Sequence, residues 1–351
     1  MNFCSDNVTG VAPEIAAALQ AANRGPAMPY GDDEITRRLE ARMAELFETA
    51  VTVFPVATGS AANALALACI TPPYGAVFCH RESHVHLDEC GAPEFYTGGA
   101  KLLALDGADG KLTADELAAA LARADTGQVH QVAPAALSVT QATEAGTVYR
   151  PDELAALSAL AHQHGMRVHM DGARFANAVV TLDAPPAELT WRAGVDVLSF
   201  GATKNGAMAA EAVVFFRPEL AAEFGFRRKR GGHLFSKMRF LSAQLEAYLA
   251  EDRWLGYAAH ANRMAARLAE GLAGIAGARL IYPVEANEIF IELPPAVIDG
   301  LDADGFKFYR WGGAAGATMR LVAGFDTRAE DVAALIAAAR AHAALAPAQE
   351  P

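Results

Sequence analysis

The chain has 351 residues and a formal net charge of −12, from 29 Lys and Arg against 41 Asp and Glu. This acidic balance argues against nucleic acid as a main partner, because a phosphate backbone calls for a basic surface. With 52% hydrophobic and 20% charged residues, the composition is that of a globular protein, and the length favours a large domain with a smaller companion.

The cysteines and the N-terminus indicate a cytoplasmic protein. The four cysteines are widely spaced and form no CxxC pair, and a chain of this length does not need disulfides. The N-terminus lacks a basic region and carries Asp6 where a signal peptide would be apolar. Residues 49–80 contain no Asp, Glu, Lys or Arg, but prolines and glycines interrupt them, which favours a buried strand–turn–helix over a membrane span.

Along the chain, helical patterns begin at Pro13 and near Asp33, and short apolar runs then alternate with helix-like segments. The runs cover residues 51–56, 76–80, 101–105, 134–140, 166–170, 195–200 and 211–216. The segments 113–124 and 151–165 have acidic first turns, which are typical of helices. This alternation predicts an α/β fold with a mainly parallel sheet.

The pattern of apolar and polar residues changes after about residue 234, and helical patterns run from there to about residue 273. Apolar runs follow at residues 278–282, 288–293, 306–311 and 318–324, and a last helix is expected over residues 328–345, before a frayed tail. We therefore predict an N-terminal segment and large domain over residues 1–240, and a small C-terminal α+β domain over residues 241–351.

Asp171 ends a predicted strand in the sequence VHMDGAR (168–174). In open α/β sheets, ligands bind beyond the carboxyl ends of the strands, so an acid here is placed to face a ligand. The alternative is an Asp that only caps the next helix.

Lys204 follows the next predicted strand, in the small-residue sequence SFGATKNG (199–206). Small neighbours allow a lysine to be partly desolvated, as a Schiff-base lysine requires. The alternative is a solvated loop lysine. Because one strand–helix–strand unit separates Asp171 from Lys204, we expect both at the same edge of the sheet.

The sequence ATGSAANALAL (57–67) predicts a strand end, a small-residue turn and a helix. Backbone N–H groups at such a helix N-terminus form an anion site suited to phosphate. The alternative is an ordinary helix cap by Thr58 or Ser60. Together, an anion cradle, a carboxylate and a lysine match the needs of pyridoxal phosphate (PLP), which are a phosphate site, a partner for the ring nitrogen and an amine.

The ordered motifs resemble, over nearly the whole chain, the low-specificity L-threonine aldolases. These are β-eliminating lyases of the aspartate-aminotransferase-like (fold type I) PLP enzymes. The motifs are FCSDNVTG, PYGDDE, ATGSAAN, SHVHLDECGAPEF, VHMDGARFANA, SFGATKNG, RRKRGGHLFSKMRFLSAQ and MRLVAGF. DECGAPEF and GATKNG are nearest to a bacterial branch that includes phenylserine aldolases.

The resemblance implies a role for each of several residues. Lys204 would be the Schiff-base lysine, Asp171 the partner of the pyridinium nitrogen, and His84 the histidine on the ring face, near the substrate's β-hydroxyl. The phosphate cradle would consist of Gly59 and Ser60. The substrate carboxylate would be held by Ser5, Arg174 and Arg320, with Arg174 also reaching the cofactor's phenolic oxygen. Guanidinium groups suit this task because their planar fork grips a carboxylate in one orientation.

Other positions match the family less directly. His86 would point away from His84 on an extended segment, so we expect His84 to serve the ring. In the family, a basic segment that corresponds to residues 227–239 reaches a neighbouring subunit's active site. The alternative is that these residues form only a solvated charged face. The candidates for such a contact are Tyr30, Arg228, Lys229 and Arg239, and Tyr30 is otherwise an ordinary turn aromatic.

The implied reaction is cleavage of L-threonine, L-allo-threonine or a related β-hydroxy-α-amino acid to glycine and an aldehyde, acetaldehyde for threonine. The general base is either His84, since an imidazole has an ordinary pKa of about 6.5, or a water held by a histidine or by the cofactor's phosphate. Alternatives are a phenylserine aldolase that releases benzaldehyde, and another lyase or an aminotransferase of this fold. A cofactor-free binding protein would have lost Lys204 or Asp171. The family implies a homotetramer of two dimers with active sites at subunit interfaces, and we predict no metal site.

Overall fold

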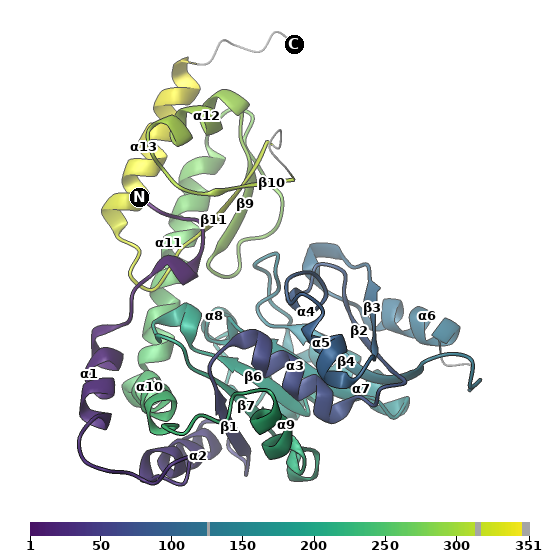
Figure 1. Ribbon diagram of the computed structural model, residues 1–351. Coiled ribbons are helices and arrows are strands. Elements are labelled where there is room, and N and C mark those ends of the chain that lie inside the picture. Colours follow the sequence, from purple (N-terminus) through teal and green to yellow (C-terminus); the bar gives the residue numbers. More distant parts are fainter. Residues whose placement is uncertain (125–126, 313–316, 346–351) are drawn as a thin grey trace.

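The computed structural model describes residues 1–124, 127–312 and 317–345. Figure 1 shows a large part built on a twisted sheet and a smaller part above it, with one long helix running from the first into the second. The tail predicted to fray, residues 346–351, lies outside the described residues. Among the described residues, no helix has both the length and the apolar composition that a bilayer crossing requires.

The large part contains every strand predicted before residue 240. The strands are β1 (Thr52–Val56), β2 (Gly75–His80), β3 (Lys101–Leu105), β4 (Ala133–Thr140), β5 (Arg167–Gly172), β6 (Val197–Gly201) and β7 (Glu211–Phe215). The helices are α1 (Pro13–Ala22), α2 (Glu34–Leu46), α3 (Gly59–Ile70), α4 (His84–Leu87), α5 (Ala92–Thr97), α6 (Ala114–Ala124), α7 (Pro151–Gln163), α8 (Phe175–Leu182), α9 (Phe224–Arg230) and α10 (Arg239–Leu249).

The seven strands form one sheet in the order β1-β7-β6-β5-β4-β2-β3. From β6 to β3 all neighbours are parallel, whereas β7 runs antiparallel to both β6 and β1. The prediction of an α/β fold with a mainly parallel sheet is therefore confirmed, with β7 as the exception. The carboxyl ends of β4, β5 and β6 consequently meet at one edge.

Helices cover both faces of this sheet, which explains why its strands are apolar runs rather than alternating patterns. Successive residues of a strand face opposite sides. Val213 of β7 packs in one cluster with Leu65 of α3, and Val214 packs in another with Leu39 of α2. The packing of α3 against the sheet places its first residues, Gly59 and Ser60, in one group with Asp171 of β5 and Lys204, which follows β6.

The small part is an antiparallel sheet covered by helices. Its strands are β8 (Arg279–Leu280), β9 (Glu288–Glu292), β10 (Tyr309–Trp311) and β11 (Thr318–Val322), in the order β10-β11-β9-β8. The helices are α11 (Arg253–Ala273), α12 (Pro295–Ala303) and α13 (Ala329–Leu345). Trp254 of α11 packs in the core of the large part and Leu268 in that of the small part. The boundary at residue 240 stays a prediction, because α11 belongs to both cores.

The N-terminal segment pairs with the small part. Phe3 is buried in its core, the Phe3 N–H donates to the Lys307 carbonyl at 2.8 Å, and the Phe3 carbonyl accepts from the Val322 N–H at 2.8 Å. This pairing shortens the strand predicted over residues 306–311. Only its second half pairs with β11, because Lys307 bonds to the N-terminal segment instead.

Candidate active site

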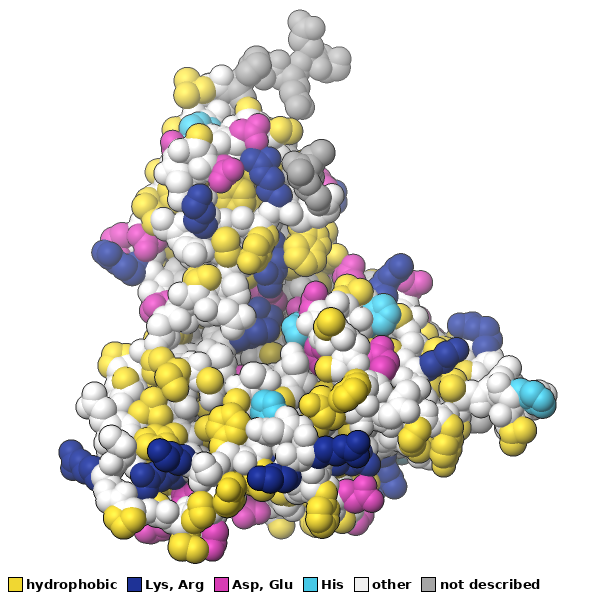
Figure 2. All heavy atoms as spheres, in the orientation of Figure 1, with side chains coloured by type: hydrophobic (Ala, Val, Ile, Leu, Met, Phe, Trp, Pro, Cys, Tyr) yellow, Lys and Arg dark blue, Asp and Glu magenta, His cyan; other side chains and the backbone are white. Residues whose placement is uncertain are grey.

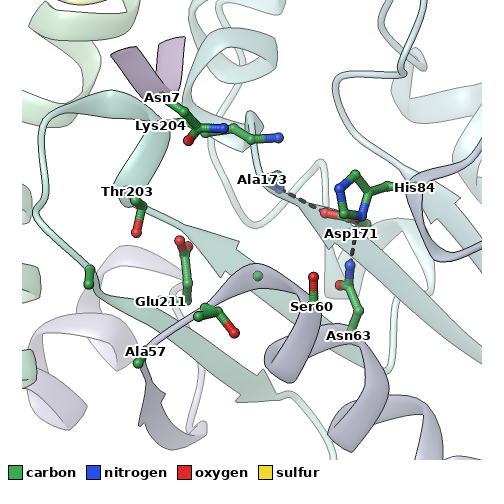
Figure 3. A pocket seen from close by; sticks show the side chains of 13 residues that line it. Asn7, Ala57, Ser60, Asn63, His84, Asp171, Ala173, Thr203, Lys204 and Glu211 are labelled. Carbon is green, nitrogen blue, oxygen red and sulfur yellow. Dashed lines mark hydrogen bonds between the residues drawn. The ribbon is translucent and has the colours of Figure 1, made fainter. Parts of the chain in front are cut away.

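A cavity of about 310 Å³ opens where β5 and β6 end. Asp171 of β5 lies opposite Ser199 of β6, and Lys204 follows in a short 3₁₀ turn, Thr203–Asn205. Five of the predicted residues line this cavity: Gly59, Ser60, His84, Asp171 and Lys204. Figure 3 shows Lys204 above the cavity, with His84, Asp171 and Asn63 grouped at one end and Glu211, Thr203 and Ala57 at the other.

Asp171 is buried and held at both carboxylate oxygens. Its Oδ1 accepts from the Ala173 N–H at 3.0 Å, and its Oδ2 accepts from Asn63 Nδ2 at 2.8 Å. The cap of the next helix, α8, is Arg174, so the alternative that Asp171 is only a helix cap is wrong. These two donors hold Asp171 in one orientation at the floor of the cavity.

His84 forms a pair with a buried acid that the sequence analysis did not identify. Its Nδ1 lies 2.9 Å from Oε1 of Glu89, which also accepts from Asn63 Nδ2 at 2.8 Å. The hydrogen bond with Glu89 raises the pKa of His84 above its usual value, and burial opposes this. Burial raises the pKa of Glu89, which its hydrogen bonds with His84 and Asn63 act to lower. Asn63 thus joins His84, through Glu89, to Asp171.

The segment that carries His84 and His86 is a helical turn, α4, and the expectation of an extended segment is wrong. The two side chains still diverge, because two residues on a helix are separated by roughly 200°. His84 lines the cavity, whereas the exposed His86 bonds through Nδ1 to the Arg81 carbonyl at 3.1 Å.

The same end of the cavity could also hold a cation. His84, Glu89 and Asp171 each offer a ligand atom, and these atoms lie within 4.8 Å of one another. In the structure, a hydrogen bond already joins His84 to Glu89, and Asn63 donates to both Glu89 and Asp171.

The anion cradle is the N-terminus of α3. The Thr58 side chain caps this helix by accepting from the Ala61 N–H at 3.2 Å, so the capping alternative is right for Thr58. Gly59 and Ser60 follow it and line the cavity. A Cβ at Gly59 would meet no heavy atom within 4 Å, so there is open space beside the start of this helix. An anion cradle, a lysine amine and a buried carboxylate around one cavity are the groups that PLP requires.

Arg174 is a predicted substrate ligand, but it is not among the residues that line the cavity. The side chain is buried between two acids, with Nε 2.8 Å from Asp6 Oδ2 and NH1 3.2 Å from Glu288 Oε2. Burial acts to raise the pKa of Asp6, but the charges of Arg174 and Lys204 and the hydrogen bonds that Asp6 accepts lower it to about 2.

Arg320 and Ser5 lie next to this buried pair. Arg320 donates a short hydrogen bond to Glu288, and its buried Nε has no hydrogen-bond partner among the described residues. The Ser5 hydroxyl accepts from the Asn7 N–H at 3.1 Å, and Asn7 itself lines the cavity. The structure thus places the three predicted carboxylate ligands around Asp6 and Glu288, outside the cavity lining, and their role stays a prediction.

The basic segment is not one solvated face. Figure 2 shows Lys and Arg side chains gathered over α9, yet Arg228 is buried, with NH1 3.3 Å from the Pro55 carbonyl. Burial lowers the pKa of Arg228 to about 10. Lys229 Nζ lies 5.1 Å from the centre of the Tyr30 ring, and Arg239 NH1 donates to the Gly25 carbonyl at 3.0 Å.

Four further residues around the cavity were missed by the sequence analysis: Asn63, Glu89, Glu144 and Glu211. Glu144 follows β4, the third strand that ends at this edge, and the strand-end rule that identified Asp171 applies to it as well. Burial raises the pKa of Glu144, which the charges of Lys204 and Arg174 act to lower. Glu211 had a visible signal, because it is the one charged residue of the strand EAVVF.

The chain is similar in sequence and in structure to proteins named threonine aldolase. The chain is 49% identical over 331 residues to the low specificity L-threonine aldolase of Pseudomonas aeruginosa, covering 94% of each chain. It is 46% identical over 340 residues to the protein of that name from a Pseudomonas species, covering 97% of each. Its structure matches that of Leishmania major threonine aldolase with a TM-score of 0.91 at 28% identity, over 97% of this chain and 99% of that one.

These similarities confirm the predicted resemblance to threonine aldolases and the predicted fold class. Residues 2–294 also match the family model described as "Beta-eliminating lyase". Because the match covers most of the chain, it shows the family. The chain belongs to the β-eliminating lyase family.

Proposed function

We propose that the chain is a PLP-dependent aldehyde-lyase, a low-specificity L-threonine aldolase. It cleaves L-threonine, L-allo-threonine and related β-hydroxy-α-amino acids to glycine and an aldehyde. The observation that carries the proposal is the single cavity lined by Lys204, Asp171, His84 and the Gly59–Ser60 turn. The names and coverage of the two Pseudomonas relatives support it.

The chain's residues divide the work of holding the cofactor. Lys204 would bind it covalently, Asp171 would keep its ring nitrogen protonated, and the N-terminus of α3 would take its phosphate. PLP, when bound, supplies an electron sink for the electron pair of the bond that breaks at Cα. Asp171 can keep a positive charge beside it because Ala173 and Asn63 hold its carboxylate in place.

Arg174 and Arg320 orient the substrate by its carboxylate, and Ser5 assists them. By fixing the carboxylate, these residues would decide which bond at Cα is presented for cleavage. Arg320 has a buried Nε–H without a partner in the described part of the chain, and this donor suits a carboxylate oxygen. Glu288 pairs with both guanidinium groups, and Asp6 pairs with that of Arg174.

His84 removes the proton of the β-hydroxyl group. As the O–H bond breaks, the C–O bond becomes a carbonyl, the Cα–Cβ bond opens, and the aldehyde leaves; a proton then returns to Cα to give glycine. Glu89 keeps the imidazole in one orientation, and only neutral His84 can accept a proton. A water held by His84 would serve in the same place.

Assays of glycine and aldehyde, with L-threonine, L-allo-threonine and L-phenylserine, test this function. Equal amounts of glycine and acetaldehyde are expected from the first two substrates, and Lys204→Ala should abolish their release. Lys101→Ala, at an exposed lysine of β3, is the matched control. Borohydride reduction should fix the cofactor on Lys204, detected by peptide mass. Preferred release of benzaldehyde would indicate a phenylserine aldolase, and cofactor attachment without aldehyde release would overturn the aldolase proposal.

The proposal includes a homotetramer of two dimers with active sites at subunit interfaces. Phe95 and Phe226 are 77% and 80% exposed and line one groove with Arg227 and Arg230. Exposed aromatic side chains gathered in one place are typical of surfaces that another chain covers. Light scattering of the purified protein measures its oligomeric state. A monomer that retains full activity would contradict the proposed homotetramer.

A cytoplasmic location is also part of the proposal. All four cysteines are free, and three of them, Cys4, Cys69 and Cys79, are at least partly buried. Free thiols are the usual state in a reducing compartment. Fractionation of the source cells would test the location.

A further inference from the structure

Glu211 is a buried acid that the proposed mechanism does not use. It lies beside the lysine turn, the 3₁₀ turn Thr203–Asn205 that carries Lys204. It is the first residue of β7, where it lies opposite Gly201 of β6 and Val56 of β1, and it is 6% exposed. One carboxylate oxygen, Oε2, accepts from the Ala202 N–H at 2.9 Å. The side chain therefore ties the start of β7 to the turn that carries Lys204.

The groups around Glu211 do not neutralise it with a direct ion pair. Among the described residues, no Lys, Arg or His nitrogen lies within ion-pair distance of its carboxylate. On the lysine turn, the Lys204 charge and the Thr203 hydroxyl face it. From α10, the phenol of Tyr248 is close, but it is bonded to Asn205 Nδ2 at 2.7 Å.

Two basic side chains beside β1, those of Arg228 and His233, are engaged elsewhere. On the side of β1, buried Arg228 donates to the Pro55 carbonyl at 3.3 Å. His233 accepts from the Ala57 N–H through Nδ1 at 3.3 Å. Both groups therefore contact the end of β1 rather than the carboxyl group of Glu211.

Burial decides the charge of this side chain. Burial raises the pKa of Glu211 to about 7. The hydrogen bonds from Thr203 and Ala202 and the charge of Lys204 act in the opposite direction. Near neutral pH, the side chain can therefore change its protonation state when a charged ligand arrives.

Glu211 shares its cavity with the anion cradle. Thr58, Gly59, Ser60 and Glu211 line the same space of about 310 Å³. In Figure 3, Glu211 points into the cavity at the end of Thr203 and Ala57, away from Asp171 and His84. A phosphate bound at the cradle would bring negative charge next to the carboxyl group, and like charges in one site favour the neutral form of the acid. A neutral carboxyl group can also donate a hydrogen bond, which a carboxylate cannot.

We propose that Glu211 is a cofactor-binding residue that faces the phosphate of PLP as a neutral carboxylic acid, so that cofactor binding takes up one proton at this side chain. The inference rests on the proposed function, because it requires PLP in this cavity. Its consequence is that the phosphate's contribution to affinity falls as the pH rises, since Glu211 must be protonated again before the phosphate can bind.

The test compares PLP with pyridoxal, which has the same ring and aldehyde but no phosphate. The affinity of the full-length apoprotein for each is measured between pH 7.5 and 9, where the phosphate stays a dianion because its second pKa is about 6. The ratio of PLP to pyridoxal affinity should fall by up to about tenfold per pH unit for the wild type. It should be independent of pH in Glu211→Gln, whose amide cannot ionise. Glu89→Gln, at a buried acid on the ring side of the cavity, is the matched control and should keep the slope.

A constant ratio for the wild type, or an equal slope in Glu211→Gln, would overturn the inference while leaving the aldolase proposal standing. Failure of the wild type to bind PLP at all would instead overturn the proposed function, and this inference with it. If Glu211→Gln does not fold, calorimetry of the wild type in two buffers of different ionisation enthalpy replaces it. PLP binding should then take up more protons at pH 8 than pyridoxal binding does, and equal uptake contradicts the inference.

Discussion

Asp6 and Arg174 form a buried two-bond ion pair between the N-terminal segment and the edge of the large sheet. Arg174 Nε donates to Asp6 Oδ2 at 2.8 Å and NH2 to Oδ1 at 3.1 Å, and the side chains are 3% and 1% exposed. Asn287, on the approach to β9, donates to the same Asp6 Oδ2 at 3.0 Å. A single carboxylate thus joins three distant segments of the chain beside the cavity.

Removal of this charge should destabilise the fold. Asp6→Asn leaves Arg174 paired with Glu288 alone. We expect a loss of about 3 kcal/mol in the free energy of unfolding, because a buried charge loses one of its two acidic partners. The measurement is urea unfolding at pH 7. Asp32→Asn, at an exposed Asp–Arg pair, is the control and should change stability by less than about 1 kcal/mol. Equal effects of the two substitutions would contradict this role of Asp6.

The same pair predicts how stability depends on pH. The pKa of Asp6 is lowered to about 2 in the folded chain, whereas an unfolded Asp has a pKa of about 3.9. The group therefore contributes stability above about pH 4, and this contribution is lost as the pH falls toward 2. Between pH 6 and pH 3, the free energy of unfolding should fall less for Asp6→Asn than for the wild type, as measured from unfolding curves. Parallel losses in the two proteins would refute the assignment.

Glu89 should control the pH dependence of the reaction through His84. The hydrogen bond from Glu89 raises the pKa of His84, and only the neutral imidazole accepts a proton. In a plot of kcat against pH, activity should therefore rise around a pH above 6.5. In Glu89→Gln this rising limb of the profile should move to lower pH. The kcat profile between pH 5 and 9 measures it, with the exposed neighbour Asp88→Asn as the control. A limb that stays in place would show that His84 is not the base.

Asp171→Asn should separate cofactor binding from catalysis. The amide cannot stabilise a protonated ring nitrogen, so kcat should fall by about 100-fold or more, as when a group that stabilises developing charge is removed. Lys204 and the cradle remain, and the absorbance of the bound cofactor should persist. Asn63→Ala, which removes one donor to the Asp171 carboxylate, should lower kcat less. Near-normal kcat in Asp171→Asn would exclude its proposed role.

The two hydroxyl groups at the start of α3 should have different functions. Thr58 caps the helix, and Thr58→Ala should cost about 1 kcal/mol of stability, whereas Thr58→Ser should restore it. The Ser60 side chain lines the cavity without capping α3. Ser60→Ala should therefore weaken PLP binding several-fold at nearly unchanged stability. Thermal unfolding measures the stability of the three variants, and PLP titration measures their affinity for the cofactor. Equal changes in stability and in affinity for Thr58→Ala and Ser60→Ala would contradict the different functions of the two hydroxyl groups.

Local sequence was enough to find the centre of the site. Asp171, Lys204 and the Gly59–Ser60 turn each follow an apolar run that is recognisable as a strand. In a parallel sheet, the carboxyl ends of neighbouring strands meet at one edge, so Asp171 and Lys204 were expected to converge. The Gly59–Ser60 turn was added to them because PLP requires a phosphate site. The structure places all of them around one cavity.

Residues whose importance depends on distant partners were not found in this way. Glu89 matters because Asn63 of α3 connects it to Asp171, and Glu288 matters because it bonds to both Arg174 and Arg320. Hydrophobic periodicity reports only which face of an element is buried, and it contains no information about which elements meet.

The sequence by itself thus determined the α/β class, the strands of the large sheet and the residues at their carboxyl ends, because these depend on local patterns of apolar residues and turns. Only the tertiary structure decided that β7 runs antiparallel between β1 and β6, which places Glu211 beside the lysine turn. It also decided that the N-terminal segment pairs with the small part, bringing Asp6 to Arg174. These contacts join residues far apart in the chain, and they form because burial of both cores and pairing of buried charges outweigh the entropy lost in bringing such segments together.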